Sequence, residues 1–416
     1  MTATTATALT KLFAYRRGRL ANSSLYSLAG LSLRTGAQVA LLVLLARAFG
    51  VGGFGAFTTV VAISTLLAPL ACLGTPTPLV RDVAQDPRTY PARLATALVA
   101  WLCAAPVVTL GATVLATLLP LQISWQTVAA IVAAEVLFAP LVNLAAQSFQ
   151  AHERAGAMAA IMSGLIVFRL AVGLGLLGAG VLTLDTYAWG QLAATALYAG
   201  AVIAGVVRRY GMPAWHAASL SHALQTGRAF MAIDVAQRVQ AEVNKPILLS
   251  LAGAPAAGVF AAAHRAIDAA TLPFTAFVTA AAPRIYRAAG APRAVLALLP
   301  VPLLGAAGLG VAVWFAASLL PWLLGPSYEA AVAPTRMLCA LPLFSLLRML
   351  SVTALVASGR QQVLMFISFL AGGASALLTM GLVPLLGPAG AVYSLYLVEG
   401  LVILAALFVF RSQWQA

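Results

Sequence analysis

The sequence predicts an all-α polytopic membrane protein, with about twelve transmembrane helices in two pseudo-symmetric six-helix lobes around a central cavity. Three observations lead to this fold class: the composition, the number of long apolar segments, and a similarity between the two halves of the chain. Of the 416 residues, 62% are hydrophobic and only 8% are charged, and the mean hydropathy is +0.97. Soluble domains carry roughly 25% charged residues, so the composition excludes an ordinary water-soluble fold.

A membrane span needs about 20 mostly apolar residues, and about twelve segments of the chain meet this requirement. The first six expected spans are Leu25–Ala46, Phe54–Gly74, Leu94–Leu118, Ser124–Gln147, Ala157–Val181 and Asp185–Val207. The second six are Ala229–Leu251, Ala256–Pro283, Arg293–Leu320, Pro334–Ala357, Val363–Val383 and Ala389–Phe410. Cys72, Cys103 and Cys339 all lie in apolar segments, without the spacing of a disulfide framework or a metal site.

The basic residues between the expected spans gather on one side of the membrane, and the loops on the other side contain only Arg47. The basic side contains Lys11, Arg16, Arg17, Arg19, Arg81, Arg88, Arg93, Arg154, Arg208, Arg209, Arg228, Arg284, Arg287, Arg293, Arg360 and Arg411. This asymmetry predicts a multi-pass membrane protein with both termini in the cytoplasm. Because topology explains the net charge of +14, we expect no nucleic-acid partner.

The two halves of the chain share a short pattern at an offset of 203 residues. Segment "LLARAFGVGGFGAF" (44–57) aligns with "LLSLAGAPAAGVFA" (248–261), so that Gly50 corresponds to Gly253 and Gly55 to Gly258. Each copy joins the first expected span of a half to the second. The expected organisation is a cytoplasmic segment (1–24), an N-lobe (25–207), a cytoplasmic linker (208–228), a C-lobe (229–410) and a cytoplasmic tail (411–416).

Charged residues inside the expected spans are the main candidates for function, because a charge in the bilayer faces protein or a water-filled cavity. The bases are Arg34, Arg169, Arg238, Lys245, Arg265, Arg336 and Arg348, and the acids are Glu135, Asp234, Glu242, Asp268 and Glu399. The basic excess favours an anionic substrate, and arginine suits phosphate because its planar group binds two oxygens at once. The alternative is that these residues form buried ion pairs that only hold helices together.

Two neighbouring spans contain the densest group of charges. Asp234, Arg238, Glu242 and Lys245 are spaced by four, four and three residues, which places them on one face of a helix. The following span reads "FAAAHRAIDAA", with His264 four residues and Arg265 three residues before Asp268. We expect this face to line a central cavity, and we expect Arg34 to line it too. Arg336 is expected to reach the membrane interface and Glu399 to be a satisfied polar residue, whereas Arg169 and Arg348 fit either role.

The sequence contains no phosphate-binding Walker loop, no metal-ligand spacing and no long extramembrane domain, so we expect no cofactor and no enzyme activity. Transport would then draw on an ion gradient or on the gradient of the substrate. The titratable groups closest to the bases are the candidates for coupling to H⁺ or Na⁺. These candidates are Asp234, Glu242, His264 and Asp268.

Four segments, in this order along the chain, resemble segments of bacterial polysaccharide flippases. These are "LLARAFGVGGFGAFTTVVAISTLLAPLACLGTPTPLVRDVA" (44–84), "NKPILLSLAGAPAAGVFAAAHRAID" (244–268), "LLPWLLGPSYEAAVAPTRML" (319–338) and "VPLLGPAGAVYSLYLVEG" (383–400). The chain is identified as a member of the MATE-like multidrug/oligosaccharidyl-lipid/polysaccharide (MOP) superfamily, of the lipid-linked oligosaccharide (O-antigen) flippase type. One departure is Asn244, at a position where many members carry an acid.

The resemblance implies that undecaprenyl-diphosphate-linked oligosaccharide units move from the inner to the outer leaflet by alternating access, coupled to H⁺ or Na⁺. Arg47 matches the arginine that ends the first helix of the family, Gly50 and Gly55 match its turn glycines, and Glu329 matches an acid of its outer loop. Arg47 thus joins the substrate-binding candidates. Expected partners are the lipid-linked oligosaccharide, membrane lipids, a polysaccharide polymerase and the export machinery, with the chain as a monomer. The alternatives are a multidrug or metabolite exporter of the same superfamily, or a membrane-embedded glycan polymerase.

Overall fold

The computed structural model describes residues 3–214, 217–288 and 291–414, and within these residues every regular element is a helix. The helices of the first half are α1 (Ala3–Ala71), α2 (Pro76–Gln85), α3 (Tyr90–Thr117), α4 (Trp125–Val132), the π-helical turn η2 (Ala133–Phe138), α5 (Ala139–Ala151), α6 (Ala155–Gly178) and α7 (Leu184–Tyr210). Those of the second half are α8 (Ala217–Glu242), α9 (Asn244–Arg287), α10 (Pro292–Leu298), α11 (Pro300–Ala316), α12 (Leu320–Leu324), α13 (Val332–Met337), α14 (Leu341–Ala357), α15 (Gln361–Leu386) and α16 (Ala389–Trp414). Short 3₁₀ turns occupy Pro87–Thr89, Ala317–Leu319 and Pro326–Ala331.

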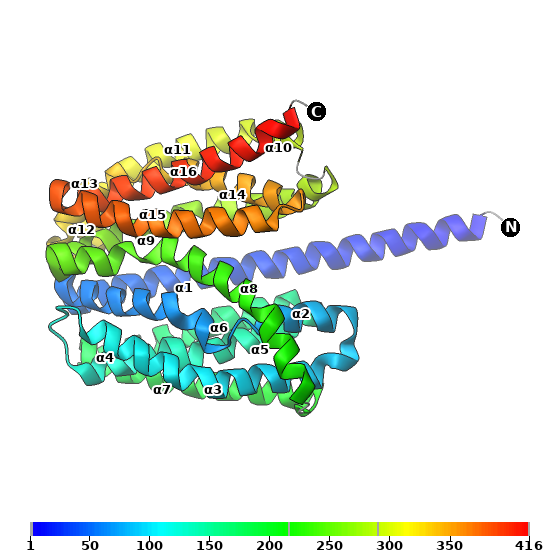
Figure 1. The fold of residues 1–416 in the computed structure, drawn as a ribbon, viewed down its shortest axis with the longest axis horizontal. Helices are drawn as coiled ribbons and strands as arrows, with labels where there is room; N and C mark the ends of the chain where they lie inside the picture. Colours follow the sequence, from blue (N-terminus) through cyan, green and yellow to red (C-terminus); the bar gives the residue numbers. More distant parts are fainter. Residues whose placement is uncertain (1–2, 215–216, 289–290, 415–416) are drawn as a thin grey trace.

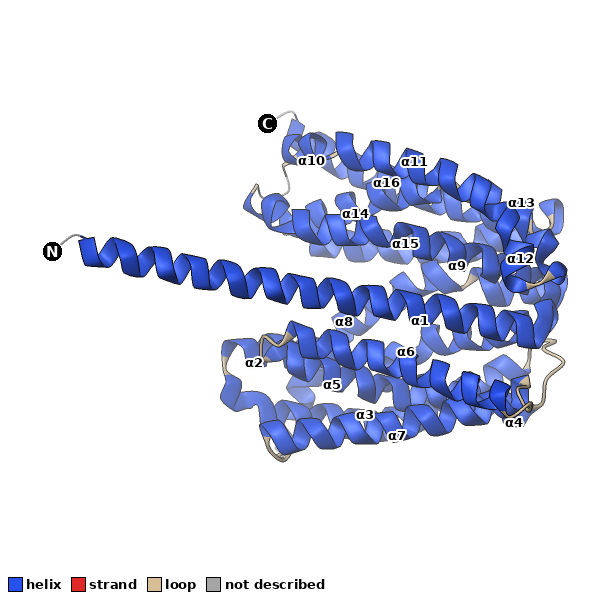
Figure 2. Ribbon diagram, turned by 180° about the vertical axis from the view of Figure 1, so that it is seen from behind, coloured by secondary structure: helices blue, strands red, loops and turns tan. Residues whose placement is uncertain are grey.

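The helices form two bundles that lie side by side (Figures 1 and 2). The first half of the chain forms one bundle, which we call the N-lobe, and α9–α16 form the other, the C-lobe, with α8 joining the two. Helix α1 begins and α16 ends at the same end of the molecule, which we call the terminal end, and the opposite end is the distal end. The two-lobe, all-helical fold class predicted from the sequence is confirmed.

The number of membrane spans also agrees with the sequence prediction. Within the described residues, nine helices are long and apolar enough to cross a membrane, and the bent pair Pro326–Met337 and Leu341–Ala357 makes a tenth. Two of the ten, Leu33–Ala71 and Phe230–Arg287, each contain a glycine with non-helical dihedral angles, which divides the helix into two spans. The described chain therefore contains twelve spans.

The two dividing glycines are Gly50 and Gly253, which are related by the offset of 203 residues. Gly50 has φ 65° and ψ 179°, and Gly253 has φ 86° and ψ 169°. A side chain disfavours this part of φ/ψ space, so glycine lets the chain reverse at the distal end with no loop. The same turn at matching positions of both halves supports an internal repeat. Because each half has an even number of spans, the repeats run parallel in the membrane.

Some expected boundaries differ from the observed helices. Helix α8 begins at Ala217, inside the segment 208–228 that was expected to be a linker. The expected span Arg293–Leu320 is divided between α10 and α11 where Pro300 begins the second helix. The expected span Pro334–Ala357 is bent by 51° between α13 and α14. At the N-terminus, α1 is one continuous helix from Ala3 into the first span.

Candidate functional site

Three cavities adjoin one another between and within the two lobes. A cavity of about 550 Å³ lies between the N-lobe and α8, a second of about 380 Å³ lies between α1, α6, α7 and α9, and a third of about 400 Å³ lies inside the C-lobe. Glu135 lines the first two, Asp268 lines the last two, and Gln237 lines the first and third. We call this connected space the central chamber, and its parts the entrance, apolar and C-lobe cavities.

Arg169 and Glu135 form an ion pair on the N-lobe wall of the chamber. Their side chains are 13% and 15% exposed, and Arg169 Nη1 lies 2.6 Å from Glu135 Oε1. Gln191 donates a hydrogen bond of 2.7 Å to the same carboxylate oxygen, and Arg169 Nε donates one of 3.1 Å to Thr195 Oγ1. Glu135 belongs to the π-helical turn η2, a geometry that often marks functional sites. This network holds the Arg169 guanidinium firmly in place.

Asp234 and Arg238 line the entrance cavity from α8. Arg238 Nε lies 3.1 Å from Asp234 Oδ1, and the two side chains are 37% and 48% exposed. A second guanidinium nitrogen of Arg238 lies 3.5 Å from the Thr65 carbonyl oxygen of the N-lobe. The pair is open to the cavity, so solvent screens its attraction, and a ligand can compete for the guanidinium.

His264, Arg265 and Asp268 lie where the apolar and C-lobe cavities meet. His264 Nδ1 and Arg265 Nη1 each lie 3.5 Å from Asp268 Oδ2, a distance typical of a loose ion pair. Arg265 is 40% exposed and Asp268 46% exposed, whereas His264 is only 13% exposed and stacks on Phe260. Arg265 therefore presents donors to the chamber that its carboxylate partner holds only weakly.

Arg348 and Glu399 pair inside the C-lobe cavity. Arg348 Nε lies 2.7 Å from Glu399 Oε2 and donates a hydrogen bond of 3.0 Å to Oε1. Glu399 was expected to be a satisfied polar residue, and its side chain is 12% exposed and paired. With this pair, each of the five acids in the expected spans has a basic partner.

Glu242 and Lys245 line none of the three cavities. The two side chains form an ion pair, and Lys245 is 2% exposed. Pro246 follows Lys245 and has no amide hydrogen to donate to the Glu242 carbonyl, so the helix is interrupted and α9 begins at Asn244. The four charges expected on one cavity face are thus divided into an exposed pair, Asp234 and Arg238, and a buried pair.

Asn244, next to the buried pair, is a hydrogen-bond centre of the C-lobe. Its side chain is 1% exposed, and its Oδ1 accepts hydrogen bonds of 3.0 Å from Ser375 and 2.7 Å from Thr379. Thr379 is also 2.9 Å from Ser394 Oγ. Asn244 therefore ties α9 to α15, and Thr379 ties α15 to α16, without a buried charge.

Replacing Lys245 with methionine should destabilise the protein by about 3–5 kcal/mol, because it leaves the Glu242 carboxylate buried and unpaired. The double replacement Lys245→Met, Glu242→Gln removes both charges and should recover most of that loss. Thermal unfolding in detergent would measure both, with Arg88→Ala as the control at an exposed arginine. A double variant as unstable as the single one would contradict a mainly structural role for this pair.

Arg34 and Arg47, like Lys245, line none of the three cavities of the chamber. Arg34 is half-buried in the terminal half of α1, and it makes no ion pair with the part of the chain that the structure describes. Arg47 lies near the distal end, where its Nε and Nη2 each donate a hydrogen bond of 2.7 Å, to the carbonyl oxygens of Leu323 and Trp322. Arg47 thereby links the two lobes.

The lobes meet closely at the distal end. A Cβ atom on Gly55 would lie 1.9 Å from the Ala254 carbonyl oxygen, and one on Gly258 would lie 2.1 Å from the Val51 carbonyl oxygen. These two contacts are equivalent under the offset of 203 residues. Tyr328 is fully buried beside them, and its hydroxyl lies 3.3 Å from the Ala46 carbonyl oxygen. Together with Arg47, these contacts close the chamber at the distal end.

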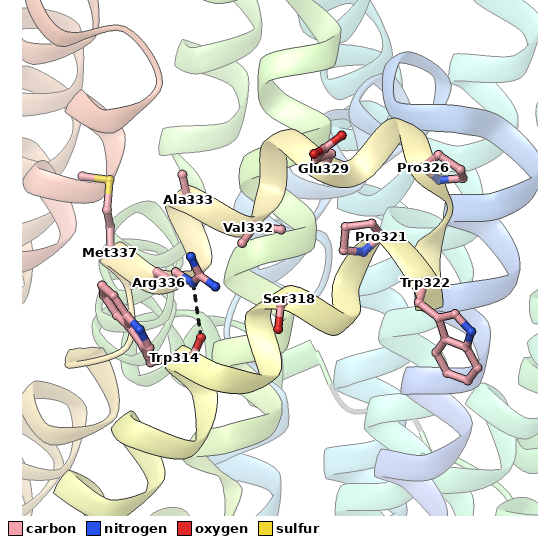
Figure 3. A pocket seen from close by; sticks show the side chains of 10 residues that line it. All are labelled: Trp314, Ser318, Pro321, Trp322, Pro326, Glu329, Val332, Ala333, Arg336 and Met337. Carbon is pink, nitrogen blue, oxygen red and sulfur yellow. Dashed lines mark hydrogen bonds between the residues drawn. The ribbon is translucent and has the colours of Figure 1, made fainter.

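A further cavity of about 950 Å³ lies at the distal end, outside the chamber (Figure 3). Arg336 lies over the Trp314 ring at 5.5 Å and donates a long hydrogen bond of 3.4 Å to the Trp314 carbonyl oxygen, drawn as a dashed line in Figure 3. Glu329 lines the same cavity from the 3₁₀ turn Pro326–Ala331. Tryptophan and arginine side chains at a helix end are typical of the membrane interface, the place expected for Arg336.

Several site residues were missed by sequence reasoning. Gln191 and Thr195 are polar residues four apart on α7 that face Glu135 and Arg169, and this spacing inside an apolar span could have pointed to them. Tyr328 lies in the segment that resembles the flippase outer loop. It contacts Ala46 of α1, which is 282 residues away in the sequence, so the sequence did not reveal this contact. Within the described residues, no three His, Cys, Asp or Glu side chains are grouped as a metal site would require.

Comparisons with known proteins agree with this architecture. Among proteins of curated function, none matches this sequence. The structure resembles the lipid II flippase MurJ in an inward closed conformation, with a TM-score of 0.73 and 12% identity over 93% of this chain and 87% of that chain. It resembles a multidrug resistance MATE family transporter of the MOP superfamily in an inward-facing conformation, with a TM-score of 0.70 and 12% identity over 94% of this chain and 99% of that chain. It also resembles a Vibrio cholerae MATE transporter, with a TM-score of 0.61 and 17% identity over 95% of this chain and 97% of that chain.

The family model for polysaccharide biosynthesis proteins matches residues 20–289, which is more than half of the chain. The resemblance to polysaccharide flippases of the MOP superfamily, noted from the sequence, is confirmed by this match together with the shared fold. This multi-pass membrane protein therefore belongs to the polysaccharide biosynthesis protein family and has the two-lobed fold of MOP-superfamily flippases and transporters.

Proposed function

We propose that this protein flips undecaprenyl-diphosphate-linked oligosaccharide units from the inner to the outer leaflet of a bacterial cytoplasmic membrane. The observation that carries the proposal is the pair of accessible guanidinium groups in the central chamber, Arg238 and Arg265. Both are more than one-third exposed and only loosely paired with carboxylates. A diphosphate offers several oxygens to such groups, and charge-assisted hydrogen bonds between arginine and phosphate are among the stronger polar contacts. The family supports the proposal through its role in polysaccharide biosynthesis.

The proposed orientation places the terminal end in the cytoplasm. The helix ends and turns at this end carry Arg81, Arg88, Arg93, Arg154, Arg208, Arg209, Arg284, Arg287 and Arg360, and the cytoplasmic ends and loops of membrane proteins are enriched in such residues. The lobes are in contact at the distal end, which then faces outward. The structure corresponds on this assignment to a state that accepts substrate from the inner leaflet, and opening of the distal contacts would release it outside.

Transport in proteoliposomes tests the function. The purified protein is reconstituted with lipid-linked oligosaccharide extracted from the producing cells, and movement between leaflets is followed with a lectin or an enzyme that reaches only the outer leaflet. Protein-dependent movement of the lipid is the expected result. Transport of cationic drugs without movement of the lipid would favour the multidrug exporter, and lengthening of the glycan would favour the polymerase.

An imposed H⁺ or Na⁺ gradient should change the rate of flipping, and replacing Asp234 by asparagine should weaken this dependence. Arg238 is shared between Asp234 and the proposed diphosphate, so substrate binding removes a partner from the carboxylate and favours its occupation by a cation. The measurement compares the wild type with the Asp234→Asn variant under each gradient. If neither gradient alters the wild-type rate, Asp234 serves only as a partner of Arg238.

A further inference from the structure

The C-lobe cavity is lined by more serine and threonine side chains than the other two cavities of the chamber. It lies between α8, α9, α14, α15 and α16, and about half of its lining side chains are polar, with hydroxyls from several helices, two glutamines and the Arg348–Glu399 pair. Along α9 it extends from His264 to Thr279, a rise of about 22 Å in a helix. Its volume of about 400 Å³ lies within the range of small-molecule sites.

Several polar groups in this cavity have no partner within the protein. Ser345 and Ser368 face the cavity from α14 and α15, and neither hydroxyl makes a hydrogen bond with the part of the chain that the structure describes. The same holds for the side-chain amides of Gln237 and Gln240. Ser368 is 5% exposed and lines the cavity, so water or a ligand bound there can supply a partner for its hydroxyl.

The neighbouring apolar cavity combines an apolar wall with charged groups. Leu41, Leu45, Phe54 and Phe57 line it, together with the Arg169–Glu135 pair. Arg265 and Asp268 also line it, and Asp268 is shared with the C-lobe cavity. A ligand bound at Arg265 would therefore have the leucine and phenylalanine wall on one side and the hydroxyl-rich C-lobe cavity on the other.

We propose that the C-lobe cavity is the binding site for the saccharide portion of the substrate. This inference rests on the proposed flipping of a lipid-linked saccharide. With the diphosphate at Arg265, the sugar hydroxyls enter the polar cavity, where serine hydroxyls and glutamine amides donate and accept hydrogen bonds and the Glu399 carboxylate accepts them. The elongated cavity suits a chain of sugar rings, and its polar side chains select among glycans, because a site built to bind hydroxyls rejects a ligand that lacks them.

The double variant Ser345→Ala, Ser368→Ala tests the assignment. Neither hydroxyl has a protein partner, so their removal should leave stability unchanged. Binding of two radiolabelled probes to the purified protein is measured: lipid-linked oligosaccharide extracted from the producing cells, and undecaprenyl diphosphate without a sugar. Affinity for the sugar-bearing lipid should fall roughly 5- to 150-fold, the loss expected for two hydrogen bonds, and affinity for undecaprenyl diphosphate should stay the same. Ser250→Ala, outside the chamber on α9, is the matched control.

Thiol protection gives a second measurement in a background with Cys72, Cys103 and Cys339 replaced by alanine. A cysteine at the exposed position Thr275 in the C-lobe cavity should be shielded from a water-soluble maleimide by the sugar-bearing lipid and not by undecaprenyl diphosphate. Equal shielding by both lipids, or an equal affinity loss for both in the serine variant, overturns the saccharide site. Binding of both lipids to the wild type without any shielding also overturns it and leaves the flippase intact. Binding of neither lipid overturns the proposed function itself.

Discussion

Replacing Gly55 with alanine is expected to reduce flipping by roughly 5- to 150-fold, the effect of a change of about 1–3 kcal/mol in a conformational equilibrium. The added Cβ atom would lie 1.9 Å from the Ala254 carbonyl oxygen and 2.7 Å from the Gly258 amide nitrogen. Both are backbone atoms, so the two lobes must move apart. The distal closure would be destabilised, and the protein would spend less time in the state that accepts substrate from the cytoplasm.

The measurement combines flipping in proteoliposomes with labelling from the distal side of a single cysteine at Val61, which lines the apolar cavity. The Gly55→Ala variant should flip slowly and label faster than the parent protein. Gly52→Ala is the matched control, because its Cβ would lie 4.0 Å from the nearest atom, a side-chain carbon of Pro255. Gly258→Ala should reproduce the defect, since its Cβ would meet the Val51 carbonyl at 2.1 Å. Normal flipping in Gly55→Ala would show that this close contact does not have to form during transport.

Most of the fold could be predicted from the sequence because the membrane imposes a simple rule. Each span must be long and apolar, and the repeated glycine at Gly50 and Gly253 indicated how the halves correspond. The observed helices differ from the expected spans where a helix begins before its apolar segment, as α8 does at Ala217, and where proline or a bend divides an apolar segment, as at Pro300. Hydropathy detects where a chain is apolar, and it does not detect where the helical hydrogen bonds begin or end.

The site was less predictable, because pairing between helices depends on packing. The sequence identified Glu135 and Arg169 as intramembrane charges, yet nothing in the spacing of 34 residues indicated that they meet. The spacing of Lys245 placed it on the face of Arg238, but in the structure Lys245 is buried and pairs with Glu242. Arg47 was assigned to substrate binding through the family resemblance, but its guanidinium binds two carbonyl oxygens across the lobes. Its role as a substrate ligand remains a prediction.

Replacing Arg265 with alanine should reduce flipping at least about 10-fold, and up to about 150-fold, because a hydrogen bond to a charged group contributes about 1.5–3 kcal/mol. The fold should tolerate the change, since Asp268 keeps His264 as a partner at 3.5 Å. Arg265→Lys should give an intermediate rate, because lysine retains the charge and loses the two-pronged geometry that fits phosphate. Arg238→Ala should also impair flipping, as the second accessible guanidinium of the chamber.

Arg336→Ala is the control for this series, because Arg336 is an arginine of the same lobe that lies over Trp314 at the distal end, away from the chamber. Flipping and the export of polysaccharide from cells would be compared at matched protein levels. An equal or larger loss in Arg336→Ala would contradict the assignment of the diphosphate to the chamber. A loss in Arg265→Ala that excess lipid-linked substrate overcomes would place the defect in binding. A loss that persists at saturation would instead show that the contact with Arg265 strengthens as the lobes change state, because only such differential contacts can raise the transport rate.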